Sequence, residues 1–542
     1  MRTMWSLALV LLLAGCGGGG TATTSPPPPP PPSATLNSGP VTLMGNQGAS
    51  LSTTLTLTLN FTPTGNFGVR VSLTDRPPFD LTVQPAAGGP TRYNVLLAVD
   101  NTATPGLYSG TATLLLCADA DCVTQQAAPS VAVPYVVDVL PTGTTWPGDH
   151  LTPLSAWTDA PEWSTFQGNA AHTGFVPVDI NPALITSRWR IMGTGDTISD
   201  YSGYPQTITA TAGQFYQSGP HTLHARSEFD GSLVWQHDFT AIDPATNLPE
   251  LAYPSANPPG IYGDTVYLEA GQQSSTYFYA FNAATGARRY RTLMKSQWEH
   301  YLAPAMGPSG IYQDGGTFGG VYGFDSTSGT LLFFQEILGN VSMWTPAVDA
   351  NGVYFYGRGQ LLAFDPVSGA LTATIADASG TLSGLEIVGS PVIGKPGMVY
   401  AGTYEDSLVD GGTRGNTLTA FDLSASHIAW QLAGNFPSTP AYHAGHLYVA
   451  NENPYQIESH AEADGSLEWS WAPPREAGTH FRSEVLLTNN LLFVSTDTTT
   501  YAVDLTTRQI AWSFPMSGHL ALSRNGVLYI QNNLLICAFT VK

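Results

Sequence analysis

The sequence predicts an all-β protein in which a β-sandwich precedes an eight-bladed β-propeller. From residue 184 onward the chain repeats about every 40 to 57 residues, a period that is typical of propellers and solenoids. The 542 residues include 56 glycines and 41 prolines, which fits turn-rich β-structure better than helices. After the leader segment we find no long amphipathic helical pattern.

Residues 1–15 are predicted to be a signal peptide. Arg2 supplies the positive start, and the apolar run at 7–13 is too short to span a bilayer. The sequence Leu13-Ala14-Gly15-Cys16 resembles the lipobox of bacterial lipoproteins. This resemblance implies cleavage before Cys16, a lipid on its thiol and, because the next residue is not aspartate, an outer-membrane location. The alternative is an ordinary signal peptide with an incidental cysteine.

Residues 16–39 are predicted to be a Gly/Pro-rich tether. Consecutive prolines at 26–32 favour a polyproline II rod about 20 Å long at ~3.1 Å per residue. Such a rod would hold the rest of the chain away from the membrane. The alternative, a ligand for an SH3-type domain, is disfavoured because such partners are not expected outside the cytoplasm.

Residues 40–141 are predicted to form the sandwich, and residues 142–161 a linker. Threonine and leucine alternate along 51–61, as the two faces of a half-buried strand require. The run Pro105-Gly106-Leu107-Tyr108-Ser109-Gly110 resembles the entry to a late strand of bacterial immunoglobulin-like (Ig-like) repeats, which implies a spacer or adhesion module. Further strands are predicted at residues 67–73, 79–83, 93–99, 108–117 and 131–139.

The cysteines fit an exported protein. Cys117 and Cys122 bracket an Ala-Asp-Ala-Asp turn. A hairpin would bring the two side chains together, and an oxidising compartment would join them as a disulfide. Two free thiols are the alternative. Cys537 lies in an apolar run and is predicted to be a buried core residue.

Two series of residues define the repeat. An aromatic residue recurs in the second predicted strand of each unit, and a small residue recurs in the third, which gives eight units. The aromatic positions are Tyr216, Tyr267, Tyr312, Tyr354, Tyr400, Tyr448, Phe493 and Tyr529. The small positions are Ala225, Ala280, Gly323, Ala363, Ala420, Ala502 and Ala538, with His460 as the exception.

The last unit lacks a fourth strand, because the chain ends soon after Ala538. A strand without a unit of its own is predicted upstream at 185–190, around Trp189. We therefore expect the chain to close the ring by supplying this strand to the last blade, since closure removes the open sheet edges. Tryptophan recurs in the fourth strand at Trp235, Trp430, Trp469 and Trp512.

The repeat resembles the pyrroloquinoline-quinone-type propeller repeat. Its small–aromatic–Asp pattern is seen in Tyr279-Ala280-Phe281-Asn282-Ala283-Ala284-Thr285-Gly286 and in Tyr322-Gly323-Phe324-Asp325-Ser326-Thr327-Ser328-Gly329. Residues 163–174, Trp-Ser-Thr-Phe-Gln-Gly-Asn-Ala-Ala-His-Thr-Gly, resemble the lead-in of such propellers. The resemblance spans residues 162–542 and implies one of two functional classes. One class is the quinoprotein dehydrogenases, and the other is the BamB-like lipoproteins that assist outer-membrane barrel assembly.

The residues that an enzyme of this type needs are not found in the sequence. Quinoprotein dehydrogenases carry adjacent cysteines over the cofactor, whereas this chain has no Cys-Cys pair and no Cys-x-x-Cys-His haem motif. We therefore expect no cofactor, no metal site and no catalytic residues. The formal net charge of -21 would repel phosphate backbones, which argues against nucleic acid as a partner.

One face of the propeller is predicted to bind a partner. With strands named A to D in each blade, the A–B and C–D turns share one face and are short here. The long connections, at 237–253, 294–303, 376–389, 402–417 and 471–482, lie on the other face. Long loops on a rigid repeat scaffold are common binding sites. The predicted partner-binding residues are Trp298, Glu299, His300, Tyr301, Glu405, Asp406, Arg414, His480 and Arg482.

Together these features predict a non-enzymatic protein-binding scaffold, a lipoprotein anchored in the cell envelope whose partner is another envelope protein. A role in outer-membrane protein assembly is the leading specific hypothesis. A quinone-dependent dehydrogenase and a cell-surface adhesive module are the alternatives.

The lipid anchor is tested by the substitution Cys16→Ser. The precursor is expected to stay uncleaved or to appear in the soluble fraction, because serine has no thiol for the lipid. Cell fractionation and gel mobility measure the two outcomes. Unchanged membrane association together with unchanged mobility would contradict the lipoprotein interpretation.

Overall fold

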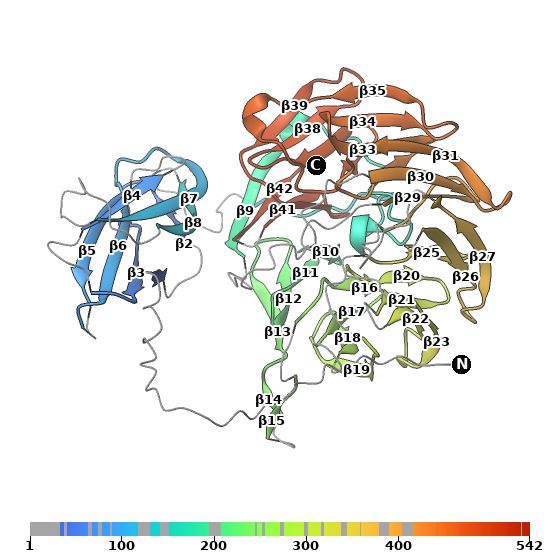
Figure 1. Ribbon diagram of the computed structural model, residues 1–542, viewed down its shortest axis with the longest axis horizontal. Helices are drawn as coiled ribbons and strands as arrows, with labels where there is room; N and C mark the ends of the chain where they lie inside the picture. The colour runs from blue at the N-terminus through green and yellow to red at the C-terminus, as the bar shows by residue number, and fades with distance from the viewer. Residues whose placement is uncertain are drawn as a thin grey trace, which may run out of the picture.

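A computed structural model gives the fold of the chain (Figure 1). The signal peptide and most of the tether lie outside the described residues, as do Cys16 and Cys122. The structure describes residues 33–36, 41–62, 68–73, 79–86, 89–117, 130–140, 142, 151–193, 207–243, 247–251, 255–271, 276–296, 302–315, 319–337, 344–357, 359–378, 390–403, 416–532 and 534–542.

The N-terminal region is a sandwich of two four-stranded sheets. One sheet has the order β1-β3-β6-β5 and the other the order β2-β8-β7-β4. Strands β2 and β8 are parallel, and the other neighbouring pairs are antiparallel. The strands are β1 (Ala34–Leu36), β2 (Val41–Asn46), β3 (Ser52–Leu59), β4 (Gly68–Leu73), β5 (Phe79–Pro85), β6 (Arg92–Val99), β7 (Gly106–Cys117) and β8 (Val131–Leu140).

Alternate residues of the strands build the sandwich core. Leu55, Leu57 and Leu59 of β3 are buried and share one core with residues of the facing sheet, whereas the threonines between them are partly exposed. This confirms the predicted Thr/Leu alternation. The tether was predicted to extend to residue 39, but Ala34–Leu36 pairs with β3 as strand β1, because its apolar side chains reach the same core.

Apart from one two-stranded hairpin, the remaining strands form eight four-stranded sheets, numbered 1 to 8 here, which are antiparallel throughout. Within each sheet the strands are named A to D outward from the middle. The A strands of sheets 1 to 7 contact their neighbours in turn, so they surround the middle of a β-propeller whose D strands form the rim (Figure 1).

The strand bounds of the propeller are as follows. Sheet 1 holds β10 (Thr209–Thr211), β11 (Gln214–Ser218), β12 (Thr222–Ser227) and β13 (Leu233–Asp238). Sheet 2 holds β16 (Gly260–Tyr262), β17 (Thr265–Ala270), β18 (Tyr277–Asn282) and β19 (Arg288–Leu293). Sheet 3 holds β20 (Ala305–Gly307), β21 (Gly310–Asp314), β22 (Gly320–Phe324) and β23 (Leu331–Glu336). Sheet 4 holds β24 (Ala347–Val348), β25 (Val353–Gly357), β26 (Gln360–Phe364) and β27 (Leu371–Ala376).

The second half of the propeller continues the pattern. Sheet 5 holds β28 (Val392–Ile393), β29 (Met398–Thr403), β30 (Asn416–Asp422) and β31 (His427–Gly434). Sheet 6 holds β32 (Ala441–His443), β33 (His446–Glu452), β34 (Tyr455–Ala461) and β35 (Leu467–Trp471). Sheet 7 holds β36 (Leu486–Leu487), β37 (Leu491–Ser495), β38 (Thr500–Asp504) and β39 (Ile510–Phe514). Sheet 8 holds β40 (His519–Leu522), β41 (Val527–Gln531), β42 (Leu535–Thr540) and β9 (Thr186–Met192).

Smaller elements accompany these sheets. A short hairpin, β14 (Ile242–Asp243) with β15 (Leu248–Pro249), follows sheet 1. The described 3-10 helices are η1 (Phe166–Gly168), η2 (Pro182–Leu184) and η5 (Arg475–Ala477).

The repeated aromatic and small residues face each other within each sheet. In sheet 2, Tyr267 on strand B is opposite Ala280 on strand C, which is opposite Tyr290 on strand D. The small residue leaves room for the rings on both sides, and a β-bulge follows it in every sheet. The structure corrects one position of the series. In sheet 6, Tyr448 is opposite Ser459, so Ser459 and not His460 is the small residue.

Five C–D turns are shaped to receive a ring from the preceding sheet. In sheet 2 the Asn282 side chain accepts hydrogen bonds from backbone N–H groups of the turn. Gly286 adopts a φ of 70°, and a Cβ there would lie 2.6 Å from the Trp235 indole of sheet 1. Trp235 also donates its Nε1–H to Ala283 O at 2.7 Å. The same ring-over-glycine contact recurs at Gly231, Gly329, Gly369 and Gly465.

Strand β9 completes sheet 8. It pairs antiparallel with β42 and places Trp189 opposite Ala538. The fully buried Trp189 ring lies 5.3 Å from that of Phe215 in sheet 1 and 5.9 Å from that of Tyr529 in sheet 8. Its Nε1–H donates to Glu228 O at 2.9 Å. The prediction that the first strand of the region joins the last sheet is confirmed.

Residues 163–174 are called the axial segment here. The segment includes η1, runs along the A strands of the sheets and lies near the middle of the ring in Figure 1. Thr165 contacts sheet 3 by donating its hydroxyl to Pro304 O. Backbone carbonyls of the segment accept hydrogen bonds from the A strands of other sheets in ring order: Trp163 from Ala210, Ser164 from Ile261, Ala170 from Val348, Ala171 from Ile393, Thr173 from Tyr442 and Gly174 from Leu487. One short segment thus joins seven of the sheets.

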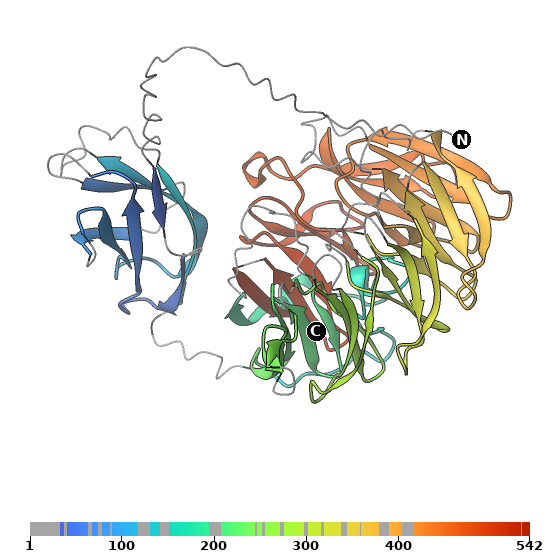
Figure 2. The ribbon, with the colours of Figure 1, turned by 60° about the horizontal axis from the view of Figure 1, so that its bottom comes forward.

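The sandwich contacts the propeller at the closing strand. Asp138 of β8 points away from the sandwich core that holds Val137 and Val139, yet its side chain is only 1% exposed. It forms an ion pair with Arg190 of β9 at 2.5 Å, and Figure 2 shows the sandwich beside the ring. Burial raises the pKa of Asp138, although Arg190 opposes the shift. Part of the predicted linker also packs on sheet 8, where Trp157 N donates to Arg524 O at 2.9 Å.

Ring closure is tested by Trp189→Ala. Removing this buried ring from the seam is expected to cost about 3–5 kcal/mol of the free energy of unfolding. Urea denaturation of the full chain measures the change. Leu184→Ala is the control, because Leu184 is 54% exposed just before β9 and its loss should change stability by no more than about 0.5 kcal/mol. A Trp189→Ala protein that unfolds like the parent would show that the ring closes in another way.

The ring-over-glycine contact is tested by comparing Gly286→Ala with Gly263→Ala. Both glycines have positive φ, 70° and 60°, so both substitutions carry backbone strain. A Cβ at Gly263 has nothing within 4 Å, whereas one at Gly286 meets Trp235. Gly286→Ala is therefore expected to destabilise the protein by about 1–3 kcal/mol more than Gly263→Ala. Equal losses of stability in urea denaturation would mean that packing of the Trp235 side chain does not depend on Gly286.

Candidate partner-binding face

The connection at residues 471–482 leads from sheet 6 to sheet 7 and lies beside the B–C loop of sheet 7. Phe481 forms an isolated antiparallel bridge with Thr496, and Arg482 N donates to Ser495 O at 2.8 Å. A D–A connection and a B–C loop therefore share one face, as predicted for this pair of loops. We call it the long-loop face.

His480 and Arg482 are the predicted partner-binding residues that the structure describes. Their side chains are 48% and 53% exposed, as contact with a partner requires. The other predicted residues lie outside the described ranges, so their position on this face stays a prediction: Trp298, Glu299, His300, Tyr301, Glu405, Asp406 and Arg414.

Asp497 fixes the segment that carries these two side chains. Its Oδ2 accepts backbone hydrogen bonds from Thr479 N at 2.9 Å and His480 N at 3.1 Å. Its Oδ1 accepts from Arg482 Nε at 2.7 Å, and the guanidinium Nη2 lies 2.6 Å from the same oxygen. One carboxylate thus holds both the backbone of the loop and the side chain of Arg482.

The pKa of Asp497 reflects this arrangement. Burial alone would raise it, but hydrogen bonds from Thr479 and Arg482 bring it below the usual aspartate value. The carboxylate is therefore charged at neutral pH, and its contribution to the stability of the loop is lost only as the pH falls through this lowered pKa.

Two further contacts come from sheet 6. Glu452 accepts a hydrogen bond from Phe481 N at 3.1 Å, and the Tyr455 hydroxyl donates to His480 O at 3.2 Å. The rings of Tyr455 and Phe481 lie 4.6 Å apart. Residues of sheets 6 and 7 therefore hold the loop from both sides. The loop can thus present His480 and Arg482 in a fixed position.

Sequence reasoning missed Asp497, Glu452 and Tyr455 as supports of this loop. Asp497 could have been found as a turn residue in the short connection between two predicted strands of sheet 7. Nothing in the sequence links it to residues 479–482, because the contact depends on two loops meeting at one face.

The described residues carry little sign of metal chemistry or of a membrane span. Among them, no three His, Cys, Asp or Glu side chains form a group that could hold a metal ion. Within the same ranges, no helix is both long and apolar enough to cross a bilayer.

Several solved structures are similar to this chain in fold, at low identity. A structure titled "Structure of Dos1 propeller" is 8% identical, with 67% of this chain and 96% of that chain covered and a TM-score of 0.48. "Dihydro-heme d1 dehydrogenase NirN in complex with DHE" is 12% identical, with 63% and 75% covered and a TM-score of 0.41. "Kluyveromyces lactis Hsv2 complete loop 6CD" is 7% identical, with 56% and 96% covered and a TM-score of 0.35. No curated protein matches the sequence.

One protein family matches the propeller. The matched segments are residues 209–432 and 414–541, and the family is described as outer membrane protein assembly factor BamB. The two segments overlap and together take in the strands of the propeller apart from β9. Because they span more than half of the sequence, the chain belongs to the outer membrane protein assembly factor BamB family.

Proposed function

We propose that this protein is a membrane-anchored envelope lipoprotein that acts as a non-enzymatic protein-binding scaffold, with a role in outer-membrane protein assembly. The observation that carries the proposal is the rigid display of His480 and Arg482 on the long-loop face. Arginine is enriched among the residues that dominate protein interfaces, and a preorganised loop loses little entropy on binding. Membership of the BamB family agrees with this role.

The axial segment supports a scaffold rather than a cofactor enzyme. Residues of this segment lie against the A strands and form backbone hydrogen bonds with one A strand after another. In this chain the middle of the ring is thus used to hold the blades together. A cofactor placed on the axis would compete with those contacts.

The order of the sheets supports an eight-bladed ring. Eight four-stranded sheets follow one another, the A strands of sheets 1 to 7 are neighbours, and Trp189 joins sheet 8 to sheet 1. We infer that each sheet is one blade.

An Ig-like assignment of the sandwich is supported by two features. The strand order β1-β3-β6-β5 against β8-β7-β4 corresponds to the ABED and GFC sheets of Ig domains, with β2 added beside β8. Tyr108, near the start of β7, donates its hydroxyl to Thr104 O at 2.7 Å, as in the tyrosine corner of that fold. We propose that this domain is a spacer between the membrane anchor and the propeller.

The proposed disulfide would close the end of the β7–β8 hairpin. Cys117 is the last residue of β7 and is buried, whereas Cys122 lies outside the described residues. An exported protein would meet the oxidising conditions that this bond needs.

Partner capture is tested with Arg482→Ala and Trp298→Ala in the full-length lipoprotein. Affinity purification from detergent-solubilised membranes, followed by mass spectrometry, should recover an envelope protein with the parent chain. Each variant should recover at least about ten-fold less, as expected for loss of an interface hot spot. The melting temperature should fall by no more than a few degrees, because the Arg482 side chain is 53% exposed and Trp298 is predicted to lie in a loop.

Arg289→Ala is the matched control. Arg289 is also a partly exposed arginine that pairs with an aspartate, but it lies on the outer strand β19. Its loss should leave capture unchanged. The face that carries the A–B and C–D turns is called the short-turn face. Crosslinks from the partner only to the short-turn face or to the sandwich would overturn the assignment of the long-loop face.

A further inference from the structure

A carboxylate and an imidazole lie buried side by side on strand C of sheet 6. Glu458 Oε2 is 3.0 Å from His460 Nε2, and the two side chains are only 8% and 7% exposed. Their cross-strand neighbours on strand B are Val449 and Leu447, which belong to a core shared with sheet 5. The two residues, called the buried pair here, therefore face sheet 5.

The Glu458 carboxylate is charged. Its Oε1 accepts hydrogen bonds from Asn451 Nδ2 at 3.0 Å and from Gln456 Nε2 at 2.7 Å. Asn451 must turn its NH2 group to the carboxylate, because its Oδ1 accepts from two backbone N–H groups. Burial alone would raise the pKa of Glu458, but the hydrogen bonds from His460 and from these two amides bring it below the usual glutamate value. The charge is lost only as the pH falls through this lowered pKa.

His460 needs a proton on both ring nitrogens to complete its contacts. Nδ1 lies 2.9 Å from Gly465 O, which can only accept a hydrogen bond. Nε2 faces the charged carboxylate of Glu458, which also can only accept. Loss of the Nε2 proton would leave two acceptors 3.0 Å apart in a buried place, where water cannot satisfy them. The carboxylate would then have to bind a proton or move away from the ring.

The carboxylate is connected to the loop that carries the proposed function. Asn451, which it holds, accepts a hydrogen bond from Asn453 N at 2.9 Å in the B–C turn of sheet 6. Glu452 and Tyr455 lie opposite each other at the same turn, and they contact the backbone of the loop at residues 480–481. A shift of the carboxylate would therefore loosen the sheet 6 side of the loop.

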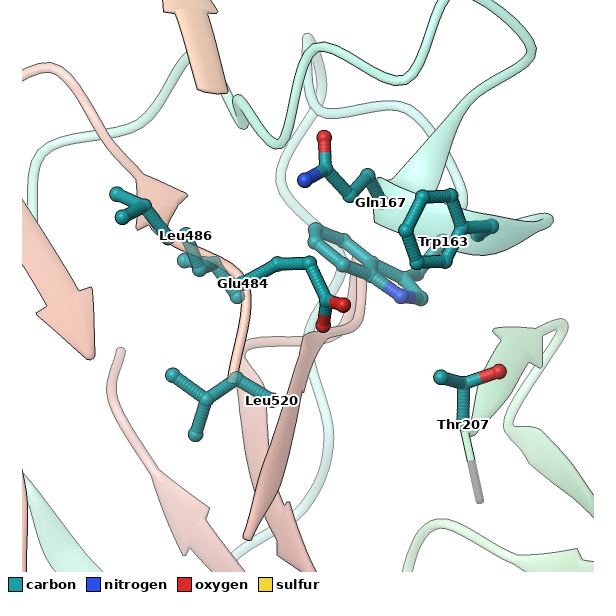
Figure 3. Close-up of a pocket in the computed structure, with 8 residues that line it drawn as sticks. Trp163, Gln167, Thr207, Glu484, Leu486 and Leu520 are labelled. Atoms are coloured by element: carbon teal, nitrogen blue, oxygen red, sulfur yellow. The ribbon is translucent and has the colours of Figure 1, made fainter. Parts of the chain in front are cut away.

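Two other imidazole–carboxylate pairs lie beside the same loop, and both are more open. His480 Nδ1 is 3.5 Å from Asp497 Oδ2, and His519 Nδ1 is 3.6 Å from Glu484 Oε2. Figure 3 shows Glu484 extending toward the indole of Trp163 in the axial segment. The His480 and His519 side chains are 48% and 26% exposed, so water can take the place of a lost partner there, unlike in the buried pair.

Other charged groups near the buried pair have partners of their own. Glu462 accepts a hydrogen bond from the Tyr400 hydroxyl at 2.6 Å and lies 3.9 Å from Lys395 Nζ, and the ring of Tyr442 lies beside that of Tyr400. Asp464 accepts a hydrogen bond within the exposed C–D turn. The side chains that sheet 5 packs against this side of sheet 6 include the uncharged Trp430, Leu432 and Phe436. A change of protonation in the buried pair therefore acts first on its own hydrogen-bond partners.

We propose that the buried pair is a proton-sensitive support of the long-loop face. This rests on the proposed function and adds a regulation of the same loop. In the charged form, Glu458 holds Asn451 and the turn that supports residues 479–482. When His460 loses a proton as the pH rises, the carboxylate is displaced, the turn loosens and Arg482 is presented less rigidly.

Hydrogen exchange at the backbone amides of residues 479–482 tests this support. Mass spectrometry follows exchange in the purified full-length protein at pH 7 and pH 9. Comparison with the rate of an unstructured chain at the same pH gives a protection factor. The protection factor of the parent should fall about ten-fold between the two pH values, as expected for a buried acceptor left without its donor.

Glu458→Gln is the first variant. Its Oε1 can accept from Asn451 and Gln456 as glutamate does, and its NH2 group can donate to the Nε2 of a neutral His460. The variant should therefore keep, at pH 9, a protection factor within about two-fold of that of the parent at pH 7. A substitution that merely removed a stabilising contact would lower protection at both pH values, and that result would contradict the proposal.

His460→Gln is a second variant, because it removes the imidazole, and its protection factor should differ by less than about two-fold between the two pH values. His480→Gln and His519→Gln are the controls and should retain the fall of the parent. A parent without the fall, or a fall that persists in Glu458→Gln or His460→Gln, would overturn the proposal. Partner capture through Arg482 is measured separately at neutral pH, so failure of this support can be told apart from failure of the proposed function.

Discussion

Strand β42 would have an unpaired edge in sheet 8 if β9 did not join it. An open edge exposes a row of N–H and C=O groups and invites pairing with other chains. The register of β9 on β42 does more than satisfy those groups, because it sets Trp189 against Ala538 and directs its ring toward Phe215 of sheet 1. The same tryptophan donates to Glu228 O of sheet 1. When β9 pairs with β42, it therefore completes sheet 8 and also brings sheet 8 into contact with sheet 1.

Two sets of contacts then keep the sheets in a ring. Near the rim, five D strands each place a ring over a glycine turn of the next sheet, and at the axis the axial segment bonds to successive A strands. The sheets that depart from this pattern support its physical explanation, that the turn residue must leave room for the ring. Sheet 4 has Ala373 where other sheets have a ring, and the next turn carries Ser426 instead of glycine. In sheet 7, Arg508 replaces the glycine and its guanidinium stacks on Trp469 at 4.4 Å.

Most of the propeller could be predicted from the sequence because its constraints repeat. The Tyr–Ala pairs, the turn glycines and the stray strand around Trp189 each leave a local pattern that eight copies make visible. The error at His460 could have been avoided from the spacing, because Ser459 stands as far before Gly465 as Ala280 stands before Gly286. Strand β1 was missed because three residues beside a proline-rich stretch carry no readable alternation.

The candidate site was less predictable for a different reason. His480 and Arg482 could be chosen as exposed polar residues of a long loop, but their support by Asp497 and Glu452 depends on contacts between separate loops. The axial segment could be recognised as a lead-in, yet its role could not be read from its side chains, because most of its contacts to the sheets are made by backbone carbonyls. Backbone hydrogen bonds leave almost no trace in the sequence.

The two faces of the ring differ in how freely they can change. On the short-turn face, turn glycines must leave room for rings, and carbonyls such as Ala283 O accept bonds from the preceding sheet. A substitution there would disturb the contact between two sheets. On the long-loop face, Asp497 and Glu452 hold the 471–482 connection through their own hydrogen bonds, outside the rim contacts. Variation in these connections can therefore change the long-loop face while closure by Trp189 and the glycine turns stays intact, which is why we propose the binding surface on that face.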